Sequence, residues 1–452
     1  MLGPRQVAQG SFFYAFSIED HVPDDHLLRK IDHFLDLSEI RAHLAPYYSH
    51  RGRPSIDPEL MIRMLLLGYT MGIRSERRLC EEVHLNLAYR WFSRLDLTDP
   101  VPDHSTFSKN RHGRFRDSDL FRHLFETVLA RCIAEGLVGG DAFGVDASII
   151  TADANRFNKI ERHKYAPEEI SRAAEEYFET LDDSAFGAAA KVQPKVLSPT
   201  DPAARMSRGR GDHSFFGYST NYLVDLENAV IVDVEATAPI RQAEVGAALD
   251  MLDRVEEIYG LYPESFVGDG AYGNAETVGW LVHGKGIEPH VPLLDKAWRK
   301  EGYLSRDDFR FDGANDRYIC PDGKDLLPHR RNFQTIRPRV KDDETIRYRA
   351  AKEDCDACAL KTQCCPKTPA RKITRSIHEG ARDLTRDISK TDAYAASRHA
   401  RKKVEMLFAH LKKIMGLTRL RLRGPNGAKD EFTLAATAQN LRKMAKLLPT
   451  PA

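Results

Sequence analysis

The chain has 452 residues, and its 67 Lys or Arg against 66 Asp or Glu give a formal net charge of only +1. This length allows two or three domains, and the balanced charge means that any nucleic-acid surface requires local segregation of cations. No apolar run approaches the ~20 residues of a membrane span, and the N-terminus lacks a secretory signal pattern, so we expect no membrane partner, a cytoplasmic or nucleoid-associated location, and reduced or metal-bound cysteines.

Residues 1–115 have the apolar periodicity of helices. Asp24 and Asp25 are placed to begin a first helix, and Asp57 followed by Pro58 is a strong start signal for a second. Ser75 is predicted to cap a third helix that runs through residue 92. The second and third helices form a candidate helix-turn-helix, although helical hairpins are also common as plain packing units.

Two stretches place an aspartate at the end of a predicted strand. Apolar residues surround Asp146 after a glycine pair, and the short apolar run before Asp269 stops at Gly268. Carboxylates at strand ends are placed to face a common site. Glycines on both sides of Asp269 leave room for a ligand to approach the backbone.

The segments between and after these aspartates predict a mixed α/β arrangement. Residues 217–238 alternate apolar and polar side chains on both sides of a central turn, which predicts a hairpin that adds two antiparallel strands to the Asp146 strand. A helix over 241–258, the Asp269 strand, a helix from Asn274 and a short strand near 287–294 are expected to follow.

The next segment is polar and contains most of the cysteines. Cys355, Cys358 and Cys364 have the Cys-x2-Cys-x5-Cys spacing of half a zinc site, and Cys320 precedes a turn suited to supply a fourth thiolate. We therefore predict a structural Zn²⁺ held by these four residues, since a metal can fold a small segment that lacks a large core. Cys365 competes for one position, and reduced cysteines without metal remain the alternative.

Residues 393–414 read as an amphipathic helix in which Glu405 is the single acid among many cations. From Ser397 to Arg423 there are nine Lys or Arg. The helix has apolar residues at helical spacing, at Val404, Leu407, Phe408, Leu411 and Ile414. A salt-bridged surface acid is the usual explanation of such a glutamate, but the two strand-end aspartates favour a site shared by all three acids.

These three acids resemble the DDE triad of bacterial insertion-sequence transposases with an RNase H-like catalytic core. Asp146, Asp269 in VGDGAYG and Glu405 in RKKVEMLFAHLKK match the triad, and residues 416–444 are similar to the family's usual ending.

In one branch of the family a Tyr, an Arg and a Lys frame the catalytic Glu. Arg401 and Lys412 match the Arg and the Lys, whereas Arg398 occupies the Tyr position and Tyr394 lies one turn earlier.

The resemblance implies an α/β protein with an RNase H-like mixed-sheet core. An all-helical N-terminal DNA-binding domain is expected at 1–115. The core is expected at 116–295 and 391–452, and a small Cys-rich insertion at 296–390 precedes the last catalytic helix.

The resemblance also implies metal-dependent cleavage of DNA and transfer of its 3′-hydroxyl ends to target DNA. Asp146, Asp269 and Glu405 would be the catalytic residues and would bind Mg²⁺ or Mn²⁺. The partner would be double-stranded DNA, both the terminal inverted repeats and the target, in an active homodimer. The cations predicted to contact DNA are Arg398, Arg401, Lys402, Lys412, Arg419, Arg421 and Arg423.

Two other functions remain open at this point. A domesticated transposase that has lost catalysis would bind DNA as a regulator, and an RNase H-type nuclease would share the triad but lack strand transfer. Supplying end DNA with Mg²⁺ and measuring both nicked and joined products separates all three.

Overall fold

The structure is a computed structural model that describes residues 16–49, 51–52, 54–166, 170–188, 190, 193–208, 213–293, 302–328 and 338–449. The chain divides into two compact units. The first is Met1–Tyr262 with Ala400–Ala452, and the second is Pro263–His399.

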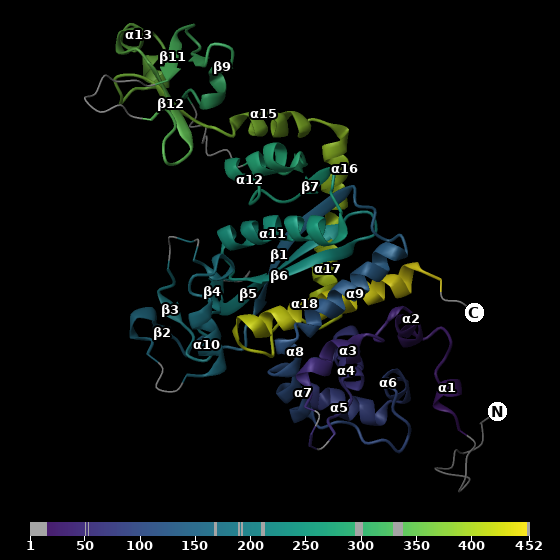
Figure 1. The fold of residues 1–452 in the computed structure, drawn as a ribbon. Helices are drawn as coiled ribbons and strands as arrows, with labels where there is room; N and C mark the ends of the chain where they lie inside the picture. Colours follow the sequence, from purple (N-terminus) through teal and green to yellow (C-terminus); the bar gives the residue numbers. More distant parts are fainter. Residues whose placement is uncertain are drawn as a thin grey trace, which may run out of the picture. The chain divides into compact units, whose positions relative to one another are not determined.

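The first unit combines many helices with an antiparallel sheet and a separate two-stranded antiparallel pair (Figure 1). Its helices are α1 (Ile18–His21), α2 (Leu27–Phe34), α3 (Ile40–Leu44), η1 (Ala45–Tyr47), α4 (Pro58–Met71), α5 (Glu76–Leu85), α6 (Leu87–Phe92), α7 (His104–Arg111), α8 (Arg114–Asp117), α9 (Leu120–Ala134), η2 (Arg162–Lys164), α10 (Arg172–Glu179), η3 (Ser184–Phe186), α11 (Arg241–Tyr259), α17 (Lys402–Lys413) and α18 (Gly424–Leu447). Its strands are β1 (Ala142–Thr151), β2 (Ile160–Glu161), β3 (Val196–Leu197), β4 (Arg205–Arg208), β5 (Ser214–Asp225) and β6 (Val230–Thr237).

The capping residues explain where the N-terminal helices begin. The Asp57 side chain accepts from Glu59 N at the start of α4, and Ser75 accepts from Arg78 N at the start of α5, as predicted. The expected first helix begins later than Asp24, because His26 caps α2.

The predicted single helix from 76 to 92 is wrong. Asn86 adopts an extended conformation, ends α5 and caps α6 by accepting from Tyr89 N, so the chain forms two helices there.

Helix α18 lies at the centre of the first unit. Its small, mostly apolar residues allow close packing against α9, β6, α4 and α2 at once. Figure 1 shows α18 beside α9, below the sheet. The N-terminal helices therefore share a core with the C-terminal helix, although they lie more than 300 residues apart in sequence.

The sheet of the first unit confirms the predicted three antiparallel strands. β5 pairs with β1 along one edge and with β6 along the other, and β4 also pairs with β5. β5 is almost entirely buried. Asp146 lies in the middle of β1 and not at a strand end, because the pairing with β5 continues to Thr151.

The segment 393–414 forms two helices, α16 (Asp392–Ala400) and α17, and not one. In α17 the side chains of Val404, Leu407, Phe408 and Leu411 are buried as predicted. Ile414 is 53% exposed, because α17 ends at Lys413 and Ile414 falls beyond the buried face.

The second unit contains a parallel strand pair with helices and a separate small sheet (Figure 1). Its helices are α12 (Ala275–Gly279), η4 (Trp280–Lys285), η5 (Arg306–Asp308), α13 (Lys352–Asp356), α14 (Lys361–Cys364), α15 (Glu379–Ile388) and α16. Its strands are β7 (Ser265–Val267), β8 (Glu288–His290), β9 (Arg310–Asp312), β10 (Arg317–Ile319), β11 (Asp325–Pro328), β12 (Thr345–Ala350) and β13 (Lys372–Ser376). The predicted strand-helix-strand order from Asp269 to residue 290 is present, with β7 and β8 parallel.

The small sheet has the order β13-β12-β11-β10-β9 and is antiparallel throughout. One of its faces packs on a core that contains Tyr318, Leu326, Tyr348, Cys355 and Cys365. Among the residues that the structure describes, this core has nine that are buried, far fewer than the first unit buries.

No helix within the described ranges is long and apolar enough to cross a membrane.

Candidate functional site

The contact between β1 and α17 is the centre of the candidate site in the first unit. The Arg401 guanidinium lies 3.6 Å from the Asp146 carboxylate, and the two side chains are 24% and 23% exposed. Because Arg401 directly precedes α17, this ion pair joins the strand that carries Asp146 to the helix that carries Glu405. Arg401 Nε is buried and, within the described part of the chain, has no hydrogen-bond partner.

Two lysines fix α17 to the sheet. Lys403 Nζ donates to the carbonyls of Leu226 and Glu227, at the turn between β5 and β6. Lys412 Nζ lies 3.4 Å from the Ile149 carbonyl near the end of β1. Burial lowers the pKa of Lys412. Both cations therefore orient the helix over the strand.

The close packing of α17 on β1 has a specific requirement at Gly144. A Cβ there would lie 2.7 Å from a Leu226 methyl and 3.0 Å from a methyl of Val404. Gly144 therefore lets α17 approach the strand two residues before Asp146.

Glu405 lies on the exposed side of α17, while its neighbour Val404 is fully buried. Asp269 belongs to the second unit and follows the end of β7 by two residues, so its predicted place after a strand is confirmed. Its carboxylate accepts from Ala271 N at 2.6 Å, which holds the side chain in the turn before α12. The convergence of Asp269 with the other two acids stays a prediction.

The cations predicted to contact DNA have different surroundings. Arg419 and Arg423 both form ion pairs with Asp153, just beyond β1. Lys402 and Arg421 are exposed, and Arg398 belongs to the second unit. Their roles in DNA binding stay predictions.

Two acids that hold the basic residues 419–423 in place were not predicted from the sequence. Glu431 of α18 is 1% exposed, accepts from the backbone N–H of Arg421 and Leu422 at 2.6 and 2.7 Å, and pairs with Arg74. An acid at the start of the apolar helical stretch that follows residue 431 was the available signal, since buried acids require partners. Asp153 carried no comparable signal, because its partners lie 266 and 270 residues away.

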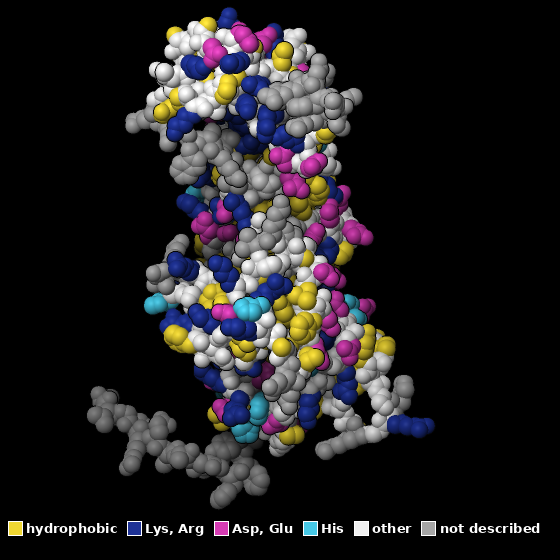
Figure 2. Space-filling view, turned by 90° about the vertical axis from the view of Figure 1, so that its left-hand side faces the viewer, with side chains coloured by type: hydrophobic (Ala, Val, Ile, Leu, Met, Phe, Trp, Pro, Cys, Tyr) yellow, Lys and Arg dark blue, Asp and Glu magenta, His cyan; other side chains and the backbone are white. Residues whose placement is uncertain are grey.

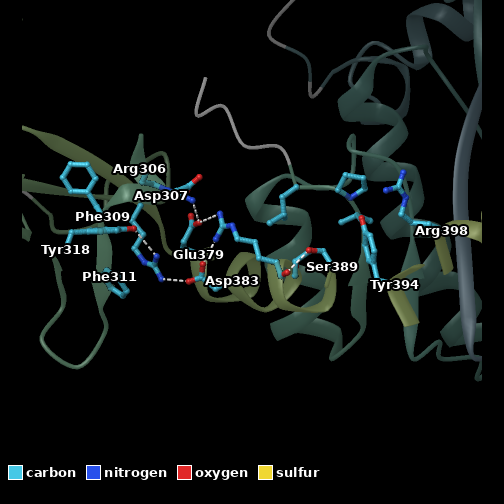
Figure 3. Close-up of a pocket in the computed structure, with 16 residues that line it drawn as sticks. Arg306, Asp307, Phe309, Phe311, Tyr318, Glu379, Asp383, Ser389, Tyr394 and Arg398 are labelled. Carbon is cyan, nitrogen blue, oxygen red and sulfur yellow. Dashed lines mark hydrogen bonds and ion pairs between the residues drawn. The ribbon is translucent and has the colours of Figure 1, made fainter. Parts of the chain in front are cut away.

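A groove of about 810 Å³ opens in the second unit between α15 and the small sheet (Figure 3). Arg306 and Arg386 converge on Glu379, and Arg375 reaches Asp383 while stacking on Phe311 with 3.8 Å between guanidinium carbon and ring centroid. The groove is basic in composition, but these arginines neutralise acids of the groove itself. Arg398 lies at its far end beside Tyr394 (Figure 3).

The Tyr394 ring packs on His290 of β8, with 5.8 Å between ring centroids, and is 8% exposed. The tyrosine nearest the predicted Tyr position therefore serves packing in this chain.

Within the described ranges, no three His, Cys, Asp or Glu side chains stand in an arrangement that holds a metal ion. The donor chemistry of the predicted sites is nevertheless suitable. Carboxylates on β1 and α17 are hard oxygen donors of the kind that Mg²⁺ prefers, and five cysteines line one small cavity in the second unit.

Comparisons with known proteins cover the helical N-terminal region and the segment that carries Glu405. Residues 16–113 match the family described as Transposase domain (DUF772), and residues 319–445, which include Glu405, match the Transposase DDE domain. No curated protein matches the chain. Among solved structures, the piggyBac transposase synaptic complex with hairpin DNA has 9% identity and a TM-score of 0.38, over 93% of this chain and 75% of that chain. The chain therefore contains matches to a transposase domain and to a transposase DDE domain, and these two matches support a DDE-type insertion-sequence transposase.

Proposed function

We propose that this protein binds the ends of its insertion sequence, cleaves phosphodiester bonds there, and transfers the 3′-hydroxyl ends to target DNA. Asp146, Asp269 and Glu405 are the proposed catalytic residues of an RNase H-like core. The family matches support the transposase class. The observation that carries the residue assignment is the Arg401–Asp146 ion pair, which joins β1 to the helix with Glu405.

The proposed metal ligands are these three carboxylates. Mg²⁺ or Mn²⁺ bound by them would supply an activated water and neutralise charge on the leaving oxygen. Asp146 and Glu405 come from two elements that Gly144, Lys403 and Lys412 hold in contact. Their separation is therefore set by rigid packing, which suits a site that must position two donors.

Arg401 has a separate role in this proposal. Its planar guanidinium forms several hydrogen bonds at once, and the side chain is 24% exposed. We propose that the exposed part of the guanidinium contacts a DNA phosphate next to the cleaved bond, while the ion pair with Asp146 keeps it oriented. Lys412 would hold α17 against β1 and contribute local positive charge.

The decisive experiment uses full-length protein, end DNA and Mg²⁺, and it measures binding, nicking and strand joining separately. Glu405→Gln preserves the size of the side chain but removes the charge that a divalent ion requires. We expect DNA binding to be retained and cleavage to fall by at least ~100-fold, since metal-based charge stabilisation contributes several kcal/mol. Glu257→Gln, at an exposed acid of α11, is the matched control.

The outcomes separate the possible functions. Wild-type protein that binds end DNA without cleaving it would support the regulator alternative, and nicks without joined products would support a nuclease. Parental cleavage by Glu405→Gln would remove Glu405 from the catalytic site.

A further inference from the structure

The second unit gathers five of the seven cysteines of the chain around one cavity of about 30 Å³. Cys320 follows β10, and the other four come from α13, α14 and the residues next to them. The lining cysteines are Cys320, Cys355, Cys358, Cys364 and Cys365. A cavity of this size holds one or two water-sized probes, which is enough for a single metal ion but not for an organic ligand.

Backbone N–H groups already point at several of the sulfurs. Lys324 N donates to Cys320 Sγ at 3.3 Å, and Leu360 N donates to Cys358 Sγ at 3.4 Å. A backbone hydrogen bond from Arg371 likewise reaches Cys355. Each of these three sulfurs thus has a backbone donor that would orient it as a metal ligand.

The charges around the cavity fit a tetrathiolate metal site. Four thiolates around Zn²⁺ have a net charge of about −2. The cavity is lined by three cations, Lys324, Lys361 and Arg371, against two acids, Asp322 and Asp354. Cations next to thiolates stabilise the deprotonated form.

The fourth ligand must come from the adjacent pair Cys364 and Cys365. Cys365 is hydrogen-bonded to both Cys355 and Cys364, and burial raises the pKa of Cys364 to about 12. In the structure these sulfurs are therefore hydrogen-bonded to each other as thiols, and they do not surround one metal position. Metal binding would displace the protons and requires rotation of these side chains.

We propose that Cys320, Cys355, Cys358 and one member of the Cys364–Cys365 pair bind one structural Zn²⁺. The metal would tie the β10–β11 turn to α13 and α14, across a core in which nine buried residues are described. Tetrahedral thiolate coordination is the preference of zinc among common divalent ions.

The test begins with wild-type protein purified under reducing conditions from zinc-containing medium. We expect one zinc per chain by elemental analysis, and Co²⁺ substitution should produce the absorption bands of tetrahedral thiolate coordination. Cys320→Ser, Cys355→Ser, Cys358→Ser and the double variant Cys364→Ser/Cys365→Ser should each lose the metal. Cys80→Ser, in α5, should keep it.

A second measurement is independent of whether these variants fold. Alkylation of the native wild-type protein, mapped by mass spectrometry, should show four protected cysteines in this cluster that become reactive once zinc is removed. Absence of zinc, a Cys355–Cys365 disulfide, or zinc retained by the double variant would overturn the proposal. None of these readouts depends on DNA cleavage, so they remain valid if the proposed function fails.

The opposite face of the small sheet supports a separate inference. Arg349 of β12 lies directly opposite Lys372 of β13. Arg347 lies two residues before Arg349 in β12, on the same face of the sheet. Like charges in such positions are destabilising unless an anion compensates them. Within the part of the chain that the structure describes, none of the three forms an ion pair, and Arg347 and Lys372 are exposed. Figure 2 shows Lys and Arg side chains on the surface of this part of the second unit.

We infer that these three residues contact phosphates of duplex DNA, an inference that rests on the proposed function. Phosphate is the compensating anion that a transposase encounters, and three cations on adjacent strands of a rigid sheet suit backbone contact more than base recognition.

Replacing Arg347, Arg349 and Lys372 by Ala should weaken DNA binding and reduce its salt dependence by about 0.9 in log–log slope for each lost contact. The matched triple variant replaces Arg339, Lys352 and Lys390, which are ion-paired with acids, and should leave the slope unchanged. If wild-type protein binds end DNA and the first triple variant has the wild-type slope, this inference is wrong while the proposed function stands. If wild-type protein does not bind end DNA, the proposed function fails first.

Discussion

The core of the first unit and the small β9–β13 sheet of the second unit bury polar groups in different ways. Around α18 the chain buries ion pairs, such as Arg74 with Glu431 and Arg122 with Asp233. The core of the small sheet contains two buried cysteines and two buried tyrosines, and Arg375 lies over the rings of Phe311 and Tyr318. The larger core surrounds its buried charges with partners from several elements, whereas the structure describes nine buried residues in the core of the small sheet. With the proposed zinc site, the small sheet would depend on a metal cross-link, while the first unit relies on buried charge.

Metal removal is the largest expected effect, because binding free energies of structural zinc are on the order of 10 kcal/mol. A strong chelator should make the 302–376 region sensitive to proteolysis while the α18 region stays protected. Limited proteolysis followed by mass spectrometry measures both regions in one sample. If the chelator leaves the proteolysis of residues 302–376 unchanged, or increases it equally in both regions, zinc does not stabilise the small sheet selectively.

Glu431→Gln tests the buried charge of the first unit. It leaves the Arg74 guanidinium buried without its counter-ion and weakens acceptance from Arg421 N and Leu422 N. We expect a loss of about 3–5 kcal/mol in the free energy of unfolding, measured by urea denaturation. Glu82→Gln is the control: it breaks an exposed helix pair with Arg78 and should cost less than about 1 kcal/mol.

Asp201→Asn tests whether ionisation of a buried acid makes the stability of the first unit depend on pH. Burial raises the pKa of Asp201 from 3.8 to about 6, and its carboxylate accepts from the Tyr218 hydroxyl at 2.6 Å. The unfolded chain therefore loses this proton first, so the Asp201 contribution to stability falls as pH rises from about 4 to about 6 and then stays constant.

Asparagine cannot ionise but retains an oxygen acceptor for Tyr218. The variant should gain about 2–3 kcal/mol relative to wild type between pH 4 and pH 7, since one pKa unit corresponds to about 1.4 kcal/mol. Urea denaturation at both pH values checks this. A gain that is the same at pH 4 and pH 7 would show that ionisation of Asp201 is not the cause.

Ser75→Ala has the smallest expected effect. Loss of the cap at the start of α5 should cost about 1 kcal/mol, because Arg78 N loses its acceptor. Ser108→Ala, at an exposed position inside α7, provides the comparison and should change the unfolding midpoint little. Equal effects would show that the cap at Ser75 contributes nothing measurable.

Local sequence signals predicted much of the secondary structure. Asp57 and Ser75 cap the helices they were expected to cap, and the alternation around Glu227 produced the β5–β6 hairpin. These signals act over a few residues, through one hydrogen bond or one face of a strand. The same kind of reasoning failed at Asn86, where an extended cap residue interrupts an apolar pattern that reads as continuous.

The sequence by itself determined the chemical inventory of this protein: three acids in matching contexts, a basic C-terminal segment and a cluster of cysteines. Only the tertiary structure decided which of these groups meet. The Arg401–Asp146 ion pair joins residues 255 positions apart, Asp153 pairs with Arg423 of the basic segment, and Glu431 pairs with the distant Arg74. The physical reason is that packing free energy depends on which faces are buried together, and no local pattern in the chain records that.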